Sequence, residues 1–254
     1  MNDPRAIARL LGLEVTAIVG AGEPVPNGGL RVERVSVLPG WHPKTALRRA
    51  IERFGSDVVP LLREHGSEMW RLAEGPVDDS FGAPRLFRDV VREASADGLT
   101  YLCDLRLPNS SFAAFPAEIR AWISDEVART GDRVRGEQIA DFARNQHTRM
   151  PIFYRGLGPK LFRFDLEAVQ RLMVRKATDV STEWASEPSD PQRVLAESDT
   201  PSATAAVVAA VGERPLPWDA LVAATGFGGD DLALGIVTAA ELGLVWLTEA
   251  HPRR

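Results

Sequence analysis

Apolar and polar residues alternate most regularly in one central stretch of the chain, residues 99–107. The side predicted to face the core consists of Leu99, Tyr101, Cys103, Leu105 and Leu107. A period of two is typical of a β-strand with one buried face. Shorter strands are predicted over residues 14–19, 30–38, 151–154 and 160–164. The turn residues at 26–29 lie between the first two of these strands, and they predict a β-hairpin or meander.

Apolar residues at the spacing of three and four predict helices between the strands. The predicted helices cover residues 4–11, 45–54, a segment starting near Ser56, and 85–96, 116–129, 135–146 and 165–174. This mixture of elements predicts an α+β or α/β domain over residues 1–178. Residues 179–201 are rich in Ser, Asp, Glu and Pro, and they predict a polar linker.

The C-terminal segment, residues 202–254, has a helical pattern of its own. Helices are predicted over 202–211, 218–225 and 230–242, followed by a strand over 244–247. Three helices, a turn before the third and a trailing strand are the order of a winged helix-turn-helix. We therefore expect a small winged-helix domain after the linker.

Three groups of residues in this segment carry a family resemblance. Leu221–Gly226, Asp231–Leu232 and Ala240–Val245 resemble the C-terminal winged helix of DprA-type proteins and of many bacterial regulators. The resemblance covers the last fifth of the chain and implies a winged-helix fold, whose usual role is DNA binding.

Charge argues against DNA binding by this segment. It has three basic and six acidic residues, and the expected recognition helix over 230–242 has no Lys or Arg. Affinity for duplex DNA comes largely from neutralised phosphates, and bases are usually read by Arg, Lys, Asn or Gln. We therefore expect the segment to contact a protein, with Trp218 and Trp246 as candidate contact residues.

A second candidate surface is the basic segment over residues 133–176. It holds ten basic and four acidic residues with aromatic residues between them, although the whole chain has a net charge of −5. Such a mixture can bind a phosphate backbone and stack bases, or dock an acidic partner. It is also typical of a solvated face over an aromatic core. The candidate binding residues are Arg144, Arg149, Arg155, Lys160 and Arg163.

Composition narrows the classes of function further. The 254 residues include one cysteine, which excludes an internal disulfide and a cysteine-based zinc site. The first residues lack the pattern of a signal peptide, and no apolar run reaches the roughly 20 residues that span a membrane, so we expect a cytoplasmic protein. Three lysines against 27 arginines favour a GC-rich bacterial source.

Candidate chemistry is sparse. Gly20-Ala21-Gly22 follows an apolar strand as a dinucleotide loop would, but the prolines after it prevent a helix, so we interpret it as a turn. Cys103 is expected to be a buried, inert thiol. The four histidines show no metal spacing. We predict no catalytic residue, no cofactor and no metal.

Three hypotheses for function follow. The main one is a non-enzymatic bacterial adaptor or accessory subunit that contacts other proteins in a multi-component system. The first alternative is a nucleic-acid-binding protein that uses residues 133–176. The second alternative is an enzyme whose site is assembled from residues scattered along the chain.

Overall fold

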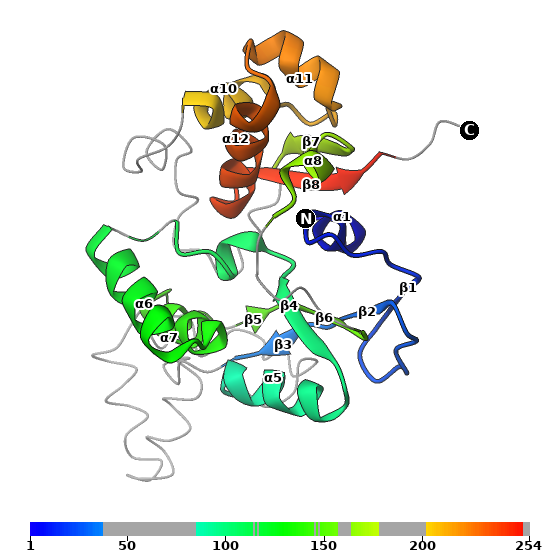
Figure 1. Ribbon diagram of the computed structural model, residues 1–254, viewed down its shortest axis with the longest axis vertical. Helices are drawn as coiled ribbons and strands as arrows, with labels where there is room; N and C mark the ends of the chain where they lie inside the picture. The colour runs from blue at the N-terminus through cyan, green and yellow to red at the C-terminus, as the bar shows by residue number, and fades with distance from the viewer. Residues whose placement is uncertain are drawn as a thin grey trace, which may run out of the picture.

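Figure 1 shows the computed structural model of the chain. It describes residues 1–37, 85–113, 115, 117–144, 146, 148–156, 164–177 and 202–250. The helices predicted over 45–54 and from Ser56, most of the strand over 160–164, and the linker over 179–201 lie outside the described residues.

The main sheet has four strands in the order β1-β2-β6-β4. They are β1 (Ala17–Val19), β2 (Gly29–Val32), β6 (Pro151–Tyr154) and β4 (Thr100–Asp104). The predicted hairpin between the first two strands is wrong, because β1 and β2 run parallel. Residues 20–28 bring the chain back to the start of β1, and Gly28 has a φ of 73° in this connection. The other pairs are antiparallel, and the mixed content gives an α+β fold.

Strand β4 departs from the predicted alternation. Its pairing with β6 shifts between Tyr101 and Cys103, and the strand ends at Asp104, three residues before the predicted end. The alternation predicts Asp104 on the polar side of the strand, opposite to Cys103, but its side chain is fully buried. A short 3-10 helix, η2 (Leu107–Asn109), follows directly and covers this end of the strand.

Among the described residues, three helices lie on one side of the sheet. They are α5 (Phe87–Ala96), α6 (Ala117–Thr130) and α7 (Arg133–Arg144). Helix α5 packs Val90 and Ala94 against Phe153 of β6, and α7 packs against both α5 and α6. A second small sheet, β3 (Val35–Ser36) with β5 (Thr148–Arg149), lies beside them (Figure 1).

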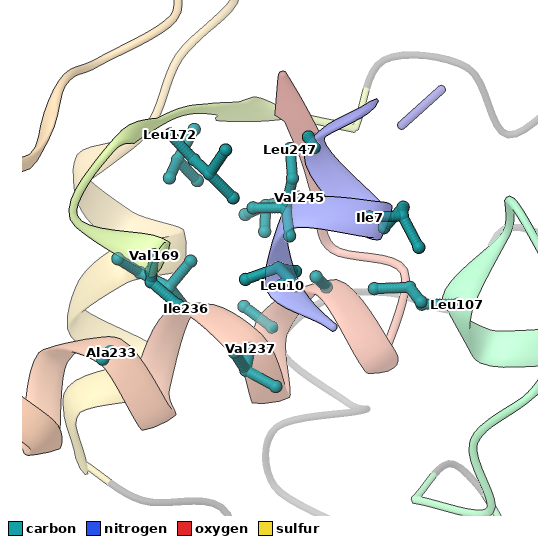
Figure 2. Close-up of a cluster of buried hydrophobic side chains, with 14 of the residues drawn as sticks. Ile7, Leu10, Leu107, Val169, Leu172, Ala233, Ile236, Val237, Val245 and Leu247 are labelled. Carbon is teal, nitrogen blue, oxygen red and sulfur yellow. The ribbon is translucent and has the colours of Figure 1, made fainter. Parts of the chain in front are cut away.

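The largest apolar core lies on the other side of the main sheet. It includes side chains of α1 (Pro4–Leu10), α8 (Leu166–Val169), α10 (Ser202–Ala210), α11 (Trp218–Thr225), α12 (Gly229–Glu241), β7 (Leu172–Lys176) and β8 (Val245–Glu249). Figure 2 shows part of this core, with Ile7 and Leu10 of α1 near Val245 and Leu247 of β8. Ile152, the neighbour of Phe153 on β6, points into this core because successive side chains of a strand face opposite sides.

A separate winged-helix domain is not shown. The predicted helix over 165–174 is wrong beyond Val169, because Leu172–Lys176 forms β7 and pairs along its whole length with β8. Strand β8, which was expected to complete a C-terminal winged helix, therefore pairs with a strand that lies before residue 179. The boundaries 1–178, 179–201 and 202–254 stay predictions, but one apolar core includes residues from both ends of the chain.

The Asn2 side chain links the C-terminal strand to the end of β4. Its Nδ2 donates to the Leu105 carbonyl oxygen at 2.8 Å, and its Oδ1 accepts from the Leu247 backbone N–H at 2.8 Å. Asp3 N–H also donates to the Leu247 carbonyl oxygen at 2.8 Å. Asn2 is 4% exposed, so water does not replace these bonds easily.

We expect Asn2→Ala to lower the free energy of unfolding by about 1–2 kcal/mol, because it leaves two buried backbone groups unpaired. Urea unfolding followed by circular dichroism measures this value. Asn27→Ala, in the turn before β2, is the control and should change stability by less than about 0.5 kcal/mol. Equal losses in the two variants would contradict a linking role for Asn2.

No single helix in the described part of the chain is both long and apolar enough to cross a membrane. Helices α11 and α12 pass that test only as a pair, and they are bent by 100° relative to each other.

Candidate functional site

Arg149 is the centre of a buried ionic network. Its side chain is fully buried, and its Nε donates to both carboxylate oxygens of Asp141 at 2.9 Å. Its Nη1 donates to Glu137 Oε2 at 2.7 Å, and its Nη2 donates to the Asn109 carbonyl oxygen at 2.9 Å. The guanidinium also lies 4.0 Å from the ring centroid of Phe87, which is cation–π geometry. Arg149 therefore joins β5 to α7, η2 and α5.

Glu137 is the second junction. Its Oε2 also accepts from the Tyr101 hydroxyl at 2.7 Å and from the Ser110 hydroxyl at 3.1 Å. Arg133, one helical turn before it on α7, donates from Nε to Glu137 Oε1 at 2.9 Å and from Nη2 to the Leu102 carbonyl oxygen. Glu137 Oε2 thus ties helix α7 to Tyr101 of strand β4, and its Oε1 orients Arg133, which bonds to the same strand at Leu102.

Asp104 closes the network at the end of β4. Its Oδ1 accepts from the Arg106 backbone N–H at 2.8 Å, and its Oδ2 accepts from the Met150 backbone N–H at 2.9 Å. Its own backbone N–H donates to the Ser110 hydroxyl oxygen at 2.7 Å. Asp104 Oδ2 is 4.0 Å from Arg149 Nη1, so the two side chains also interact electrostatically.

The network holds more carboxylates than guanidinium groups. Asp104, Glu137, Asp141 and Arg149 are buried, and Arg133 is partly buried beside them. Burial raises the pKa of Asp141 to about 7, although Arg149 acts in the opposite direction. Burial also raises the pKa of Asp104. A proton on Asp141, whose pKa lies at about 7, brings the charges of the network into balance.

The raised pKa of Asp141 makes stability depend on pH. Unfolded Asp loses its proton near pH 4, whereas folded Asp141 keeps it to about pH 7. Between these values the folded state binds more protons, so the free energy of unfolding falls as pH rises. We expect urea unfolding between about pH 4.5 and 7.5 to show a shallower fall for Asp141→Asn than for the wild type. Asp89→Asn, on α5 outside the network, is the control; parallel curves for Asp141→Asn and the wild type would contradict the assignment.

A small cavity lies next to the network. It has a volume of about 210 Å³ and is lined by Met1, Arg34, Arg106, Thr148, Met150 and Trp246. Arg106 and Met150 donate their backbone N–H groups to Asp104, and Thr148 precedes Arg149. The Nε1 of Trp246 is buried and has no hydrogen-bond partner in the described structure. The cavity and the network are therefore adjacent. Arg106 and Met150 line the cavity and bond to Asp104, and Thr148 lines the cavity next to Arg149.

The candidate residues of the basic segment lie in different surroundings. Arg149 is fully buried in the network, so its guanidinium does not reach a nucleic acid or a partner surface. Arg155 is partly buried, and its Nη2 donates to the Asp97 carbonyl oxygen at 2.9 Å. Arg144 ends α7, but its side chain lies outside the described part, as do Lys160 and Arg163. A surface role for these three residues stays a prediction.

The two candidate tryptophans have different surroundings. Trp218 is half-buried at the start of α11 and packs against the main core. Trp246 is 5% exposed and borders the cavity, so it does not belong to an exposed apolar patch. Cys103 is fully buried, and burial raises the pKa of its thiol, in agreement with an inert role. Residues 20–22 form a turn that no helix follows directly.

Sequence reasoning missed the acidic half of the network. Glu137 and Asp141 stand four residues apart within a predicted helix, so they share one face of it. That spacing, with Arg149 eight residues after Asp141, was a usable signal. Nothing in the alternation of β4 indicated that Asp104 would be buried.

One family model and solved structures are similar to this chain. A family model described as "Predicted methyltransferase regulatory domain" matches residues 80–155, less than a third of the chain. No curated protein matches the chain. The fold is similar to PKMT2 from Rickettsia typhi in complex with AdoHcy, with 15% identity and a TM-score of 0.54 over 89% of this chain. A second structure of PKMT2 from Rickettsia typhi gives 13% identity and a TM-score of 0.55 over 95% of this chain.

This chain corresponds to only part of each PKMT2 chain. The chain spans 54% and 59% of the two PKMT2 chains. At this level of identity the likeness establishes the fold alone.

The comparisons correct two predictions from the sequence. The resemblance of residues 202–254 to DprA-type and regulator winged helices is wrong, because the fold is similar to PKMT2 over 89% or more of the chain and the family match lies elsewhere. The main hypothesis of a non-enzymatic adaptor is also contradicted. The family match agrees better with the enzyme alternative than with the adaptor hypothesis.

Proposed function

We propose that this chain forms the regulatory region of a methyltransferase, and that a catalytic unit outside this chain binds the methyl donor. The observation that carries the proposal is the family match over residues 80–155. This range contains every member of the buried network, from Phe87 to Arg149. The matched segment thus contains the densely hydrogen-bonded part of the fold.

The network supports a structural rather than a catalytic role. Asp104, Glu137 and Asp141 are at most 1% exposed, and each has hydrogen bonds to protein groups. A reacting carboxylate has to reach a substrate, whereas these oxygens already accept from Arg149, Tyr101 or backbone N–H groups. Across the described residues no group of three or more His, Cys, Asp or Glu side chains could hold a metal ion. The network therefore fixes the positions of α5, α7, β4 and β5 relative to one another.

The described residues do not fit a nucleoside cofactor. AdoHcy, bound in one of the PKMT2 structures, is what S-adenosylmethionine becomes after methyl transfer. The cavity of about 210 Å³ is smaller than the roughly 300–1,000 Å³ of typical small-molecule sites. The turn at Gly20–Gly22 also lacks a helix N-terminus that could face an anionic group. We therefore derive no chemical step on this chain.

Two measurements test the proposal. Calorimetric titration of the full chain with S-adenosylmethionine and AdoHcy should show no binding. In extracts of cells that lack the gene, incorporation of radiolabelled methyl groups into macromolecules should change about fivefold or more when the purified chain is added. Bovine serum albumin at the same concentration is the control. Unchanged incorporation would contradict a regulatory role, and tight donor binding by the chain would place the cofactor site on it.

A further inference from the structure

We propose that one exposed face of helix α6, formed by Glu118, Ile119, Trp122 and Asp125, is the docking surface for the catalytic unit of the methyltransferase. These four residues are called the α6 face below. The inference rests on the proposed function, because it assigns a surface to the partner that this function requires. The matching surface of the catalytic unit would carry basic side chains around an apolar pocket.

Helix α6 leaves most of its own surface uncovered. Among its 14 residues, all of them described, Ile123 is the single buried one. The helix packs mainly against α7, where Val127 and Ile123 lie close to Gly136 (Figure 1). The stripe of α6 that contains the α6 face lies beside this contact and stays exposed. The packing of the described residues therefore does not account for its apolar side chains.

Trp122 is the centre of the α6 face. It is 59% exposed, the largest value among the exposed large apolar side chains of the described residues, and Ile119, one helical turn before it, is 38% exposed. The Trp122 side chain has no hydrogen bond or ring contact in the described structure. Tryptophan is enriched in the centres of protein interfaces and among the residues that contribute most to binding. The pair Ile119 and Trp122 can therefore fill an apolar pocket of a partner.

Two carboxylates flank this tryptophan. Glu118 lies four residues before Trp122 and Asp125 three residues after it, so both are its neighbours on the helix surface. Both are exposed, and neither has an ion pair within the described part of the chain. Glu126, by contrast, accepts two hydrogen bonds from Arg129. Unpaired carboxylates beside an indole ring favour a partner with Lys or Arg, which pair with the acids and also bind over the ring.

Charge also selects a different protein over a second copy of this chain. Two copies that met through the same face would bring Glu118 and Asp125 of one copy close to those of the other, and like charges repel. Helix α6 lies within the family match over residues 80–155. Close to half of each PKMT2 chain lies outside the part that this chain matches. These observations favour the catalytic unit as the occupant of the α6 face.

The methyl-incorporation assay with variants of the chain tests the surface. Trp122→Ala should raise the concentration of chain needed for half of the full effect about tenfold or more, because truncation of a central interface tryptophan costs that much. A double variant with Glu118→Lys and Asp125→Lys should do the same, because it repels the basic groups of the partner. The three residues are exposed, so urea unfolding of both variants should match the wild type.

A second exposed apolar residue beside acids provides the matched controls. Leu234 on α12 is 47% exposed and follows exposed Asp231 by three residues, but both lie outside the family match. Leu234→Ala and Asp231→Lys should leave the half-effect concentration within about twofold of the wild-type value. If the wild type changes incorporation and the α6 variants behave like these controls, the docking surface is wrong and the proposed function stands. No change by the wild type would contradict the proposed function, and the docking surface with it.

Photo-crosslinking identifies the partner. A chain with benzoylphenylalanine in place of Trp122 is irradiated in the same extract, and crosslinked species are then labelled with radioactive S-adenosylmethionine under ultraviolet light. We expect a labelled species, and about tenfold less of it when Glu118→Lys and Asp125→Lys are added to the probe. Benzoylphenylalanine in place of Leu234 is the control and should give no labelled species. An unlabelled partner, a crosslink between two copies of this chain, or no crosslink at all would overturn the proposal.

Discussion

Replacing Arg149 with alanine is expected to lower the free energy of unfolding by about 3–5 kcal/mol, the loss typical of a broken buried ion pair. The substitution removes the charge-assisted bonds that Arg149 makes to Asp141 and Glu137 and leaves both carboxyl groups buried, although Glu137 keeps its bond to Arg133. It also removes the bond to the Asn109 carbonyl oxygen and the contact with the Phe87 ring. Urea unfolding at pH 7 measures the change.

Two further variants make this experiment specific. Arg149→Lys keeps the charge but has one compact donor group in place of the planar fork, so it should recover only part of the lost stability. Arg92→Ala is the matched control, because Arg92 is 74% exposed and pairs with Asp89 on the surface; its loss should stay below about 0.5 kcal/mol. A loss below about 1 kcal/mol for Arg149→Ala would show that the network relaxes by protonation.

Gly235→Val is expected to lower the free energy of unfolding by about 3 kcal/mol, the upper range for overpacking a core. A Cβ atom at Gly235 would lie 2.9 Å from the Ala203 carbonyl carbon and 2.9 Å from the Ala203 Cβ. Two helices, α10 and α12, meet here with almost no space between their backbones. Because backbone atoms are in the way, a side-chain rotation cannot relieve the contact.

A glycine series tests the close approach of the two helices. Gly235→Ala should lose less stability than Gly235→Val, because it adds one methyl group rather than three carbons. Gly212→Ala is the matched control, since no atom lies within 4 Å of a Cβ built there. Thermal unfolding of the three variants gives the order. A loss for Gly235→Val no greater than that for Gly212→Ala would mean that α10 and α12 are not in close contact.

Local sequence patterns predicted many of the elements well. The expected helix over 4–11 corresponds to α1, and the helices over 85–96 and 116–129 correspond to α5 and α6. Each of these has apolar residues at helical spacing, or a cap such as Asp3, whose side chain accepts from the Arg5 N–H. Information of this kind lies within a few neighbouring residues.

Long-range pairing could not be predicted in the same way. Leu172–Lys176 became a strand because β8 lies beside it, about 70 residues later in the chain. The pattern of 165–174 alone fitted a helix, and the capping residue Asp165 does begin one. The parallel pairing of β1 with β2 could not be predicted either. Turn residues indicate that the chain changes direction, but they do not show whether the next strand runs parallel or antiparallel to the previous one.

The candidate site shows why charge patterns mislead when burial is unknown. Arg149 was grouped with surface arginines because the segment around it is basic. In the structure its three acidic partners come from β4 and two positions of α7. Arg149 is a core residue because these three partners surround it in the folded structure, which the local sequence does not show. Trp246 was likewise assigned to a surface, since the cavity around it is formed by segments distant in sequence.

The contact between α1 and β8 has a consequence for how the protein is made. Ala6, Ile7, Ala8 and Leu10 are fully buried, yet Asn2 meets Leu247 across a separation of 245 residues. At a synthesis rate of roughly 5–20 residues per second, tens of seconds pass between the synthesis of α1 and the synthesis of β8. During that time the apolar face of α1 lacks the β8 side chains against which it packs in the folded protein. Nascent chains of this protein should therefore depend on chaperones that bind short apolar helices near the N-terminus.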